Sequence, residues 1–387
     1  MSKKLKLNEI CDILNGYAFK SKKYVDKGIR VIRITNVQKG VIEDSEPKYY
    51  DISEINNLKN YMLKENDLLI SLTGNVGRVA LMSKELLPAG LNQRVGCLRI
   101  KEGRNVSIRY VYQYLNNNRF EADCINNSNG IAQKNLSTEW LKDYSIFIPD
   151  INVQNKIVDE LEKIQEIIRI KKNQIKEFNE LIKSQFVEMF GDIKDTKYKV
   201  MKLEELTNLI TDGEHKKPNY TEYGKPFISV VNITTGDLKF DNCKFVSAED
   251  SLKFQKRCKP ERNDILYTKV GATYGRSAIV NTDREFSLYV SVCLIKPKSE
   301  LINPIFLNYT MRQPYVKIQA DKCIKGIGVP DLHLIEIKKF NIIVPPIELQ
   351  NQFAEIVKQI DKQKFEIEKS LNEMQELYES LMEKYFG

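Results

Sequence analysis

The 387-residue sequence has only two histidines, no closely spaced cysteines and no long apolar run. Its seven cysteines are never closer than fifteen residues. A zinc finger or ribbon needs cysteine or histidine pairs two to four residues apart, so we expect no metal site and no disulfide framework. Apolar runs never exceed five residues, and no hydrophobic stretch follows Met1-Ser2-Lys3-Lys4. We therefore expect no membrane span, no secretory signal and a cytoplasmic location.

The charge is unevenly distributed along the chain. Apolar residues make up 42% and charged residues 29%, as in a globular protein long enough for at least two cores. The formal net charge of +8 divides into +6 for residues 1–150, zero for 151–191, +6 for 192–345 and −4 for 346–387. Two basic blocks favour a polyanionic partner such as double-stranded DNA, although a mild excess of solvated lysines would give the same values.

The chain contains a tandem repeat with a period of 196 residues. Lys6-Leu7 returns as Lys202-Leu203, and Gln154-Asn155 returns as Gln350-Asn351. Further matches at this offset are Asn36 with Asn232, Cys97 with Cys293, Pro149 with Pro345, and Phe190-Gly191 with Phe386-Gly387. A repeat of this length predicts two whole domains with their appendages rather than a solenoid.

Each copy divides into a mixed part and a helical part. In the first copy, β-rich runs cover 29–37, 68–72 and 95–100, and a helical stretch covers 108–120. The counterparts in the second copy are 227–233, 265–268, 290–295 and 304–318. Strands and helices without strict βα alternation predict an α+β fold, with globular domains at residues 1–150 and 192–345.

Two long helices are predicted, over residues 151–191 and 346–387. Apolar residues recur there at spacings of four and three over nearly four heptads, as in a coiled coil. The first stripe is Ile157, Leu161, Ile164, Ile168, Ile175, Phe178 and Ile182, and the second is Phe353, Val357, Ile360, Ile367, Leu371, Met374, Tyr378 and Leu381. Lys171 and Lys364 interrupt the stripes, and each either helps to fix one register or extends its amine into solvent.

Connectivity predicts how the helices run. The first helix delivers the chain to the second domain, so equivalent packing requires the second helix to run back. We therefore expect two homologous globular domains joined by two long antiparallel coiled-coil helices, with pseudo-two-fold symmetry. Helices of about 35 residues would span on the order of 50 Å.

This order of domain, long helix, domain, long helix resembles the specificity subunits of type I restriction-modification systems. The resemblance covers the whole chain and includes the repeated strand start Asn66-Asp67-Leu68-Leu69 and Asn263-Asp264-Ile265-Leu266, each followed by glycines. It also includes the helix start Pro345-Pro346-Ile347-Glu348-Leu349-Gln350. The first copy departs from that pattern, since Pro149-Asp150-Ile151-Asn152-Val153-Gln154 keeps only the first proline and the glutamine.

The resemblance implies that each globular domain is a target-recognition domain that reads one half of a bipartite, asymmetric DNA site. It also implies that the helices set the spacing and dock two methyltransferase subunits that methylate adenine, with restriction subunits that cleave unmodified DNA. S-adenosylmethionine, ATP and Mg²⁺ would then be bound by the partner subunits, and no cofactor by this chain.

The sequence offers no catalytic centre of its own. An amino-methyltransferase acting on a flipped adenine needs an Asn/Asp-Pro-Pro-Phe/Tyr loop, whereas Asn303-Pro304-Ile305-Phe306 has the wrong third residue and predicts a helix start. No Gly-x-x-x-x-Gly-Lys-Ser/Thr loop is present, and neither histidine recurs across the period. We expect a non-catalytic subunit. The alternative from another class is a coiled-coil adaptor that presents two protein-binding heads.

The candidate DNA contacts are polar side chains in loops, because such groups contact base edges and phosphates. In the first copy they are Lys20, Lys22, Lys23, Arg78, Asn92, Gln93, Arg94, Gln133, Lys134 and Asn135. In the second they are Lys216, Lys217, Lys269, Arg276, Tyr289, Lys322 and Lys325. Ordinary exposure to solvent is the alternative for each. Gln93-Arg94 aligns with Tyr289-Val290, so the copies are expected to read different half-sites.

Overall fold

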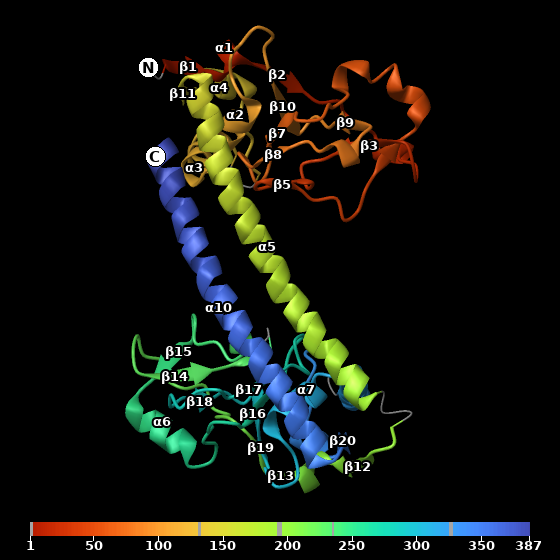
Figure 1. The fold of residues 1–387 in the computed structure, drawn as a ribbon, viewed down its shortest axis with the longest axis vertical. Coiled ribbons are helices and arrows are strands. Elements are labelled where there is room, and N and C mark those ends of the chain that lie inside the picture. The colour runs from red at the N-terminus through yellow and green to blue at the C-terminus, as the bar shows by residue number, and fades with distance from the viewer. Residues whose placement is uncertain (1–2, 131–132, 192–195, 234–235, 325–327) are drawn as a thin grey trace. The chain divides into compact units, whose positions relative to one another are not determined.

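The computed structural model describes residues 3–130, 133–191, 196–233, 236–324 and 328–387 (Figure 1). The chain forms two compact units: unit 1 comprises Met1–Lys172 and Ser370–Gly387, and unit 2 comprises Asn173–Lys369. The boundaries fall inside the two long helices rather than at their ends, so each helix contributes one part to each unit. Among the described residues, no helix is long and apolar enough to cross a membrane.

Unit 1 is built around a four-stranded antiparallel sheet. Its strands run in the order β2 (Cys11–Asn15), β10 (Val95–Ile100), β7 (Leu68–Ser71) and β8 (Val79–Leu81). In a second sheet, β3 (Ile29–Ile32) pairs antiparallel with β6 (Tyr49–Tyr50) and parallel with β9 (Ala89–Leu91). Two-stranded ladders join β1 (Lys3–Lys6) to β11 (Ser145–Ile148) and β4 (Val37–Gln38) to β5 (Val41–Ile42). The run predicted over 29–37 is split into β3 and β4, because Asn36 accepts a hydrogen bond from the Arg33 amide and forms a turn.

Four short helices complete the globular part of unit 1: α1 (Leu7–Ile10), α2 (Ile108–Leu115), α3 (Asn118–Asn126) and α4 (Thr138–Asp143). One helix was predicted over 108–120, but the structure has two. The side chain of Asn117 accepts a hydrogen bond of 2.7 Å from the Phe120 amide and so caps a new helix. Phe120, Leu115 and Leu68 share one core, which the two long helices complete.

Unit 2 repeats the main sheets of unit 1 with two changes in helix type. Helix α6 (Ala248–Gln255) stands where unit 1 has the 3-10 turns Ile52–Ile55 and Lys59–Tyr61, and the 3-10 turn Leu203–Leu206 stands where unit 1 has α1. The four-stranded sheet of unit 2 runs β13 (Thr207–Asp212), β19 (Val292–Pro297), β16 (Ile265–Thr268), β17 (Ser277–Ile279), and its second sheet runs β15 (Lys244–Val246), β14 (Lys225–Ile228), β18 (Ser287–Leu288). β12 (Lys199–Lys202) pairs with β20 (Asn341–Val344). The helices are α6 (Ala248–Gln255), α7 (Pro304–Met311), α8 (Pro314–Cys323) and α9 (Leu334–Lys338). Pro314 has no amide hydrogen, so the helix predicted over 304–318 breaks there into α7 and α8. The β-rich run predicted over 227–233 ends in a 3-10 turn, Val230–Asn232. The α+β class and its duplication are confirmed.

A buried glutamine ties the start of each long helix to its unit. Gln154 accepts a hydrogen bond of 2.9 Å from the Ser107 amide and donates one of 2.8 Å to the Pro149 carbonyl. Gln350 makes the same two bonds, at 2.9 and 2.8 Å, with Asn303 and Pro345. Because both glutamines are fully buried, their recurrence reflects a repeated structural contact.

An ion pair between a buried carboxylate and a half-buried cation also recurs. The Arg99 guanidinium donates to both oxygens of Asp67 at 2.6 Å, and the Lys296 amine donates to Asp264 at 2.6 Å. Burial raises the pKa of Asp264, and the hydrogen bond from Lys296 opposes that rise. These pairs hold the turn that leads into the central strand of each sheet.

The long helices, α5 (Ile151–Phe190) and α10 (Ile347–Phe386), run antiparallel within each unit. In unit 1, Gln165 bonds to Tyr378 and Glu160 bonds to Tyr385, so residue numbers rise along one helix as they fall along the other. In unit 2, the Lys364 amine donates to Asn179 on the facing helix at 3.1 Å. This half-buried lysine therefore makes a polar contact between the two helices.

All fifteen apolar residues of the two predicted stripes are buried or half-buried. The most buried members belong to the cores of the units: Leu161 and Ile164 in unit 1, and Ile182, Phe353 and Val357 in unit 2. The helices therefore close the hydrophobic cores of the globular parts in addition to pairing with each other.

Candidate nucleic-acid interface

Four segments of unit 1 meet at one end of its four-stranded sheet. Strands β2 and β7 finish there, and β10 and β8 begin there, because neighbouring strands alternate in direction. The segments are 16–18 after β2, 72–78 between β7 and β8, 92–94 between β9 and β10, and 133–136 between α3 and α4. We call this set the loop surface of unit 1.

Backbone hydrogen bonds join these segments. The Gln93 amide donates to the Tyr17 carbonyl at 2.9 Å, and the Leu72 amide donates to the Arg94 carbonyl at 3.0 Å. The Leu136 amide in turn donates to the Leu72 carbonyl at 2.8 Å. The four segments therefore form one continuous surface.

Gly16 makes the closest approach on this surface possible. A Cβ atom there would lie 2.2 Å from the carbonyl carbon of Asn92, and a Cβ at Gly213 in unit 2 would lie 2.0 Å from the Leu288 carbonyl oxygen. Only glycine fits at either position. The sequence analysis missed this pair of glycines, because Gly16 and Gly213 are separated by 197 residues, one more than the main period of 196.

Seven predicted DNA contacts lie on the loop surface of unit 1: Arg78, Asn92, Gln93, Arg94, Gln133, Lys134 and Asn135. Gln93, Arg94, Gln133 and Asn135 are exposed, whereas Asn92 and Lys134 are half-buried. Arg78 is engaged by the protein itself, because its guanidinium bonds to Gln38 and lies 3.8 Å from a carboxylate oxygen of Glu121.

Lys20, Lys22 and Lys23 lie on or beside a separate turn, Ser21–Lys23, and are exposed. The Lys20 amide donates to the Tyr50 hydroxyl at 2.6 Å, and the Lys23 amine lies 3.5 Å from Glu54. Within the described chain, no hydrogen bond or ion pair joins these lysines to the segments 72–78, 92–94 or 133–136.

An exposed tyrosine on the loop surface was also missed. Tyr17 is 36% exposed, and its ring centroid lies 5.1 Å from Phe19 and 5.3 Å from Tyr61. Such a ring can contact a sugar or a base beside Gln93. The repeat does not reveal this tyrosine, since unit 2 has Glu214 at the matching position.

Unit 2 builds the same surface with the same bonds. The Val290 amide donates to the Glu214 carbonyl at 3.0 Å, and the Lys269 amide donates to the Ser291 carbonyl at 3.0 Å. The Leu332 amide donates to the Lys269 carbonyl at 2.9 Å. The scaffold is therefore duplicated, while the side chains that it carries differ.

The predicted contacts of unit 2 have varied surroundings. Lys216, Lys217 and Arg276 are exposed on the loops, and Tyr289 is half-buried. Lys322 is exposed in the last turn of α8, which leads toward the segment 330–332, and Lys325 lies outside the described residues.

Lys269 is enclosed rather than presented to solvent. Its side chain is 8% exposed, and its amine lies 3.4 Å from Asp212 and 3.8 Å from Asp331. Asp212 also accepts a hydrogen bond of 2.5 Å from Arg257 and lies 3.0 Å from Nε2 of His215. This network was missed because its members are far apart in sequence. Unit 1 has the neutral Asn15 in place of Asp212.

The loop surfaces present amides, guanidinium groups, amines and phenols, which are the groups that contact base edges and phosphates. Throughout the part of the chain that the structure describes, no group of three or more His, Cys, Asp or Glu residues is placed to hold a metal ion. The arrangement suits recognition of a polyanion.

The fold defines a protein of two homologous domains, each linked to a long helix and each carrying the same loop scaffold. The family model described as the type I restriction modification DNA specificity domain matches residues 2–180 and 195–376. The chain belongs to this family, and the resemblance predicted from its sequence is confirmed.

Relatives with known names agree with this assignment. The chain is 26% identical over 404 residues to the type I restriction enzyme EcoBI specificity subunit of Escherichia coli, covering 95% of this chain and 81% of that protein. It is 22% identical over 346 residues to the type I restriction enzyme MjaVIII specificity subunit of Methanocaldococcus jannaschii, covering 82% of this chain and 79% of that protein. The fold is similar to the crystal structure of a type I restriction-modification S subunit from M. genitalium, with a TM-score of 0.62, 16% identity, and coverage of 100% of this chain and 96% of that one.

Proposed function

We propose that this chain is the DNA sequence-specificity subunit of a type I restriction-modification complex, in which each unit reads one half of a bipartite, asymmetric site. The observation that carries the proposal is the loop surface, built twice by the same backbone bonds with different side chains. Unit 1 offers Gln93, Arg94 and Tyr17 where the same bonds in unit 2 place Val290, Ser291 and Glu214. Unit 2 adds a network around Asp212. Equal scaffolds with unequal side chains suit two different half-sites.

The long helices have a second role in this proposal. They set the distance between the half-sites and dock two methyltransferase subunits, which methylate adenine, and restriction subunits join this assembly to cleave unmodified DNA. S-adenosylmethionine, ATP and Mg²⁺ are bound by those partners, and this chain supplies no catalytic group. Exposed apolar side chains on α5, including Ile167 at 40% and Ile170 at 44%, are available for such docking.

Binding of duplex DNA separates this function from that of a protein-binding adaptor. The purified chain, assembled with its methyltransferase partners, should bind duplex containing the methylated motif with an affinity that falls steeply with salt. Replacing Arg94 by Ala should weaken binding, and if it contacts a phosphate the salt slope should fall by about one. Lys84→Ala, at an exposed site outside the loop surface, is the matched control. Binding that is weak and insensitive to salt would contradict the proposal.

A further inference from the structure

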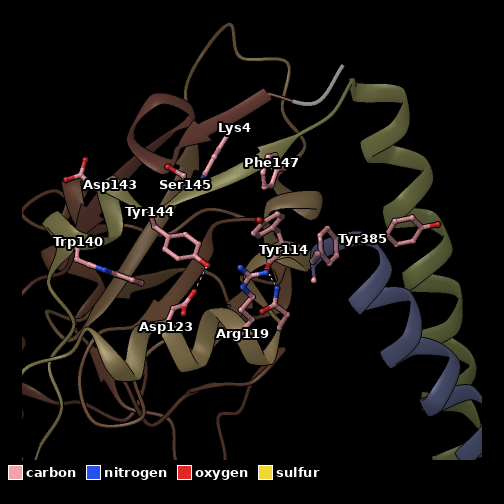
Figure 2. A pocket seen from close by; sticks show the side chains of 13 residues that line it. Lys4, Tyr114, Arg119, Asp123, Trp140, Asp143, Tyr144, Ser145, Phe147 and Tyr385 are labelled. Carbon is pink, nitrogen blue, oxygen red and sulfur yellow. Dashed lines mark hydrogen bonds between the residues drawn. The ribbon is translucent and has the colours of Figure 1, made fainter.

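Charged side chains gather in a cavity of unit 1 and on the loop surface of unit 2. The cavity has a volume of about 370 Å³, and its walls come from α3, α4, the β1–β11 ladder and the end of α10 (Figure 2). Its charged lining consists of Lys4, Arg119, Asp123 and Asp143. Because two of these are cations and two are carboxylates, charge selects no ligand for the cavity. On the loop surface of unit 2, Lys269 lies between Asp212 and Asp331, and we call these three residues the charged triad.

The charged triad is enclosed at a cost in solvation. The side chains of Asp212 and Lys269 are 4% and 8% exposed, and the lysine amine lies 3.4 Å from Asp212 and 3.8 Å from Asp331. A buried ion pair loses its hydration, and well-packed apolar side chains of similar volume often stabilise a fold as well or better. Stability therefore does not account for the triad.

Unit 1 builds the same place without charge. Asn15, Leu72 and Asn135 stand there in place of Asp212, Lys269 and Asp331. Leu72 makes the same two backbone bonds as Lys269 and is itself buried, so the scaffold needs no charge at this position. The triad therefore serves something that differs between the units, and under the proposed function that difference is the half-site.

Asp331 is the member of the triad that reaches solvent, since its side chain is 43% exposed. Its backbone is held by an antiparallel bridge to Val270 and by the bond of 2.9 Å from the Leu332 amide to the Lys269 carbonyl. Among the described residues, neither carboxylate oxygen of Asp331 accepts a hydrogen bond, although Oδ1 is buried. Asp331 thus presents an unfilled acceptor on a rigid segment of the loop surface.

A carboxylate distinguishes bases by their exocyclic groups. In the major groove, adenine and cytosine present an amine, N6 or N4, whereas guanine and thymine present a carbonyl oxygen. A carboxylate accepts a hydrogen bond from either amine and is repelled by either carbonyl oxygen. It is also repelled by the phosphates, and the Lys269 amine, 3.8 Å away, offsets that repulsion.

We propose that Asp331 reads an exocyclic amine of adenine or cytosine in the half-site of unit 2, and that Lys269 and Asp212 hold its carboxylate in place. The inference rests on the proposed function and adds to it a base-reading residue and the chemical group that this residue recognises. Lys269 is then a positioning residue rather than a DNA contact.

Asp331→Asn tests this chemistry, because asparagine keeps the shape of the side chain and adds an amide donor beside the acceptor. The variant is assembled with the methyltransferase subunits in cells without the original chain, and adenine methylation is mapped. One position of the second half-site, read as adenine or cytosine by the original chain, should now also accept guanine or thymine. The first half-site and the gap should be unchanged. Asp241→Asn, which removes an exposed carboxylate outside the loop surface, is the matched control and should keep the original motif.

Base analogues separate adenine from cytosine, and direct reading from a structural effect. In duplexes that carry the motif, each adenine of the second half-site is replaced in turn by purine, which lacks the N6 amine, and each cytosine by 2-pyrimidinone, which lacks the N4 amine. One replacement should weaken binding by the original complex about tenfold, as expected for a hydrogen bond to a charged group. Asp331→Asn should remove most of that loss, because the two changes delete the same bond, whereas Asp241→Asn should retain it.

A triple variant keeps the test informative if Asp331→Asn alone disturbs folding. D212N/K269L/D331N gives unit 2 the residues of unit 1, so it should stay folded by circular dichroism and show the same relaxed position. An unchanged motif, relaxation in the first half-site, or an analogue penalty that Asp331→Asn leaves unchanged would overturn the assignment of Asp331 while the DNA-specificity function stands. An original complex that binds no motif at all would contradict that function and this inference together.

Discussion

Gln165 on α5 donates a hydrogen bond of 2.7 Å to the hydroxyl of Tyr378 on α10. The hydroxyl donates to Gln113 at 3.3 Å, and the Gln113 amide returns to Gln165 at 3.2 Å, which closes a ring of three bonds within unit 1. The corresponding residues of unit 2 are Asp361, Ile182 and Tyr309. The long helices therefore distinguish the two units by polar contacts, although their apolar stripes are alike.

Replacing Tyr378 by Phe should destabilise unit 1. The change leaves Gln113, which is fully buried, without one of its partners, so the free energy of unfolding should fall by about 1–3 kcal/mol. Urea unfolding followed by circular dichroism measures this loss. Tyr223→Phe is the control, because Tyr223 is 81% exposed and its change should cost less than about 0.5 kcal/mol. Equal losses for the two variants would show that the ring of bonds contributes nothing.

The apolar stripes should be required for assembly. Ile164 and Ile360 are 8% and 7% exposed in the cores of units 1 and 2, so replacing both by Asp buries two charges without partners. We expect loss of partner assembly and of folding, measured by co-purification and thermal unfolding. Lys163→Asp and Lys362→Asp, at exposed positions of the same helices, form the control pair. A fully active complex from the Ile164 and Ile360 double variant would contradict the burial of these two side chains in the cores of the units.

Thiol labelling should single out Cys323. Six of the seven free cysteines are buried, and burial raises the pKa of Cys11 and of Cys258 to about 12. At pH 8 these thiols should stay protonated and shielded, whereas the half-buried Cys323 should react with iodoacetamide first. Mass spectrometry of the digested protein identifies the labelled residue. Early labelling of Cys97 or Cys293 would show that the sheets open more readily than their packing indicates.

The repeat made most of the fold predictable, because an offset of 196 residues aligned the first strands, the starts of the long helices and the buried Gln154 and Gln350. The strands of the four-stranded sheets match at 197 or 198 residues instead, so Gln93-Arg94 corresponds to Val290-Ser291 and not to Tyr289-Val290. The breaks at Asn117 and Pro314 were missed, since apolar periodicity continues across them while capping and a missing amide end the helix. The loop surface was predicted only in part. Residue type and position placed Arg94 and Gln93 among the predicted contacts, and both lie on the loop surface, but the Asp212 network depends on contacts between distant segments. Lys269 looked like a surface cation, yet its amine lies between two carboxylates.

The length of the helices should set the gap between the half-sites. One heptad inserted after Lys172 in α5 and one after Lys369 in α10, at the boundaries between the units, lengthens both helices by about 10.5 Å and keeps their stripes nearly in phase. At about 3.4 Å per base pair, the gap should grow by about three base pairs. A heptad inserted in α5 alone is the control and should disrupt assembly. Methylation mapping in cells that lack the original chain gives the gap, and an unchanged gap with full activity would mean that the helices do not set it.

The most direct test exchanges one globular domain. Residues 1–150, which carry the loop surface of unit 1, are replaced by the corresponding segment of a relative with a different specificity, and the chimera is expressed with the methyltransferase subunits in cells without the original chain. Adenine methylation is then mapped across the genome. The account predicts a motif in which one half-site is new, while the other half-site and the length of the gap are unchanged. A motif altered in both halves, or one not altered at all, would contradict the assignment of one half-site to each unit.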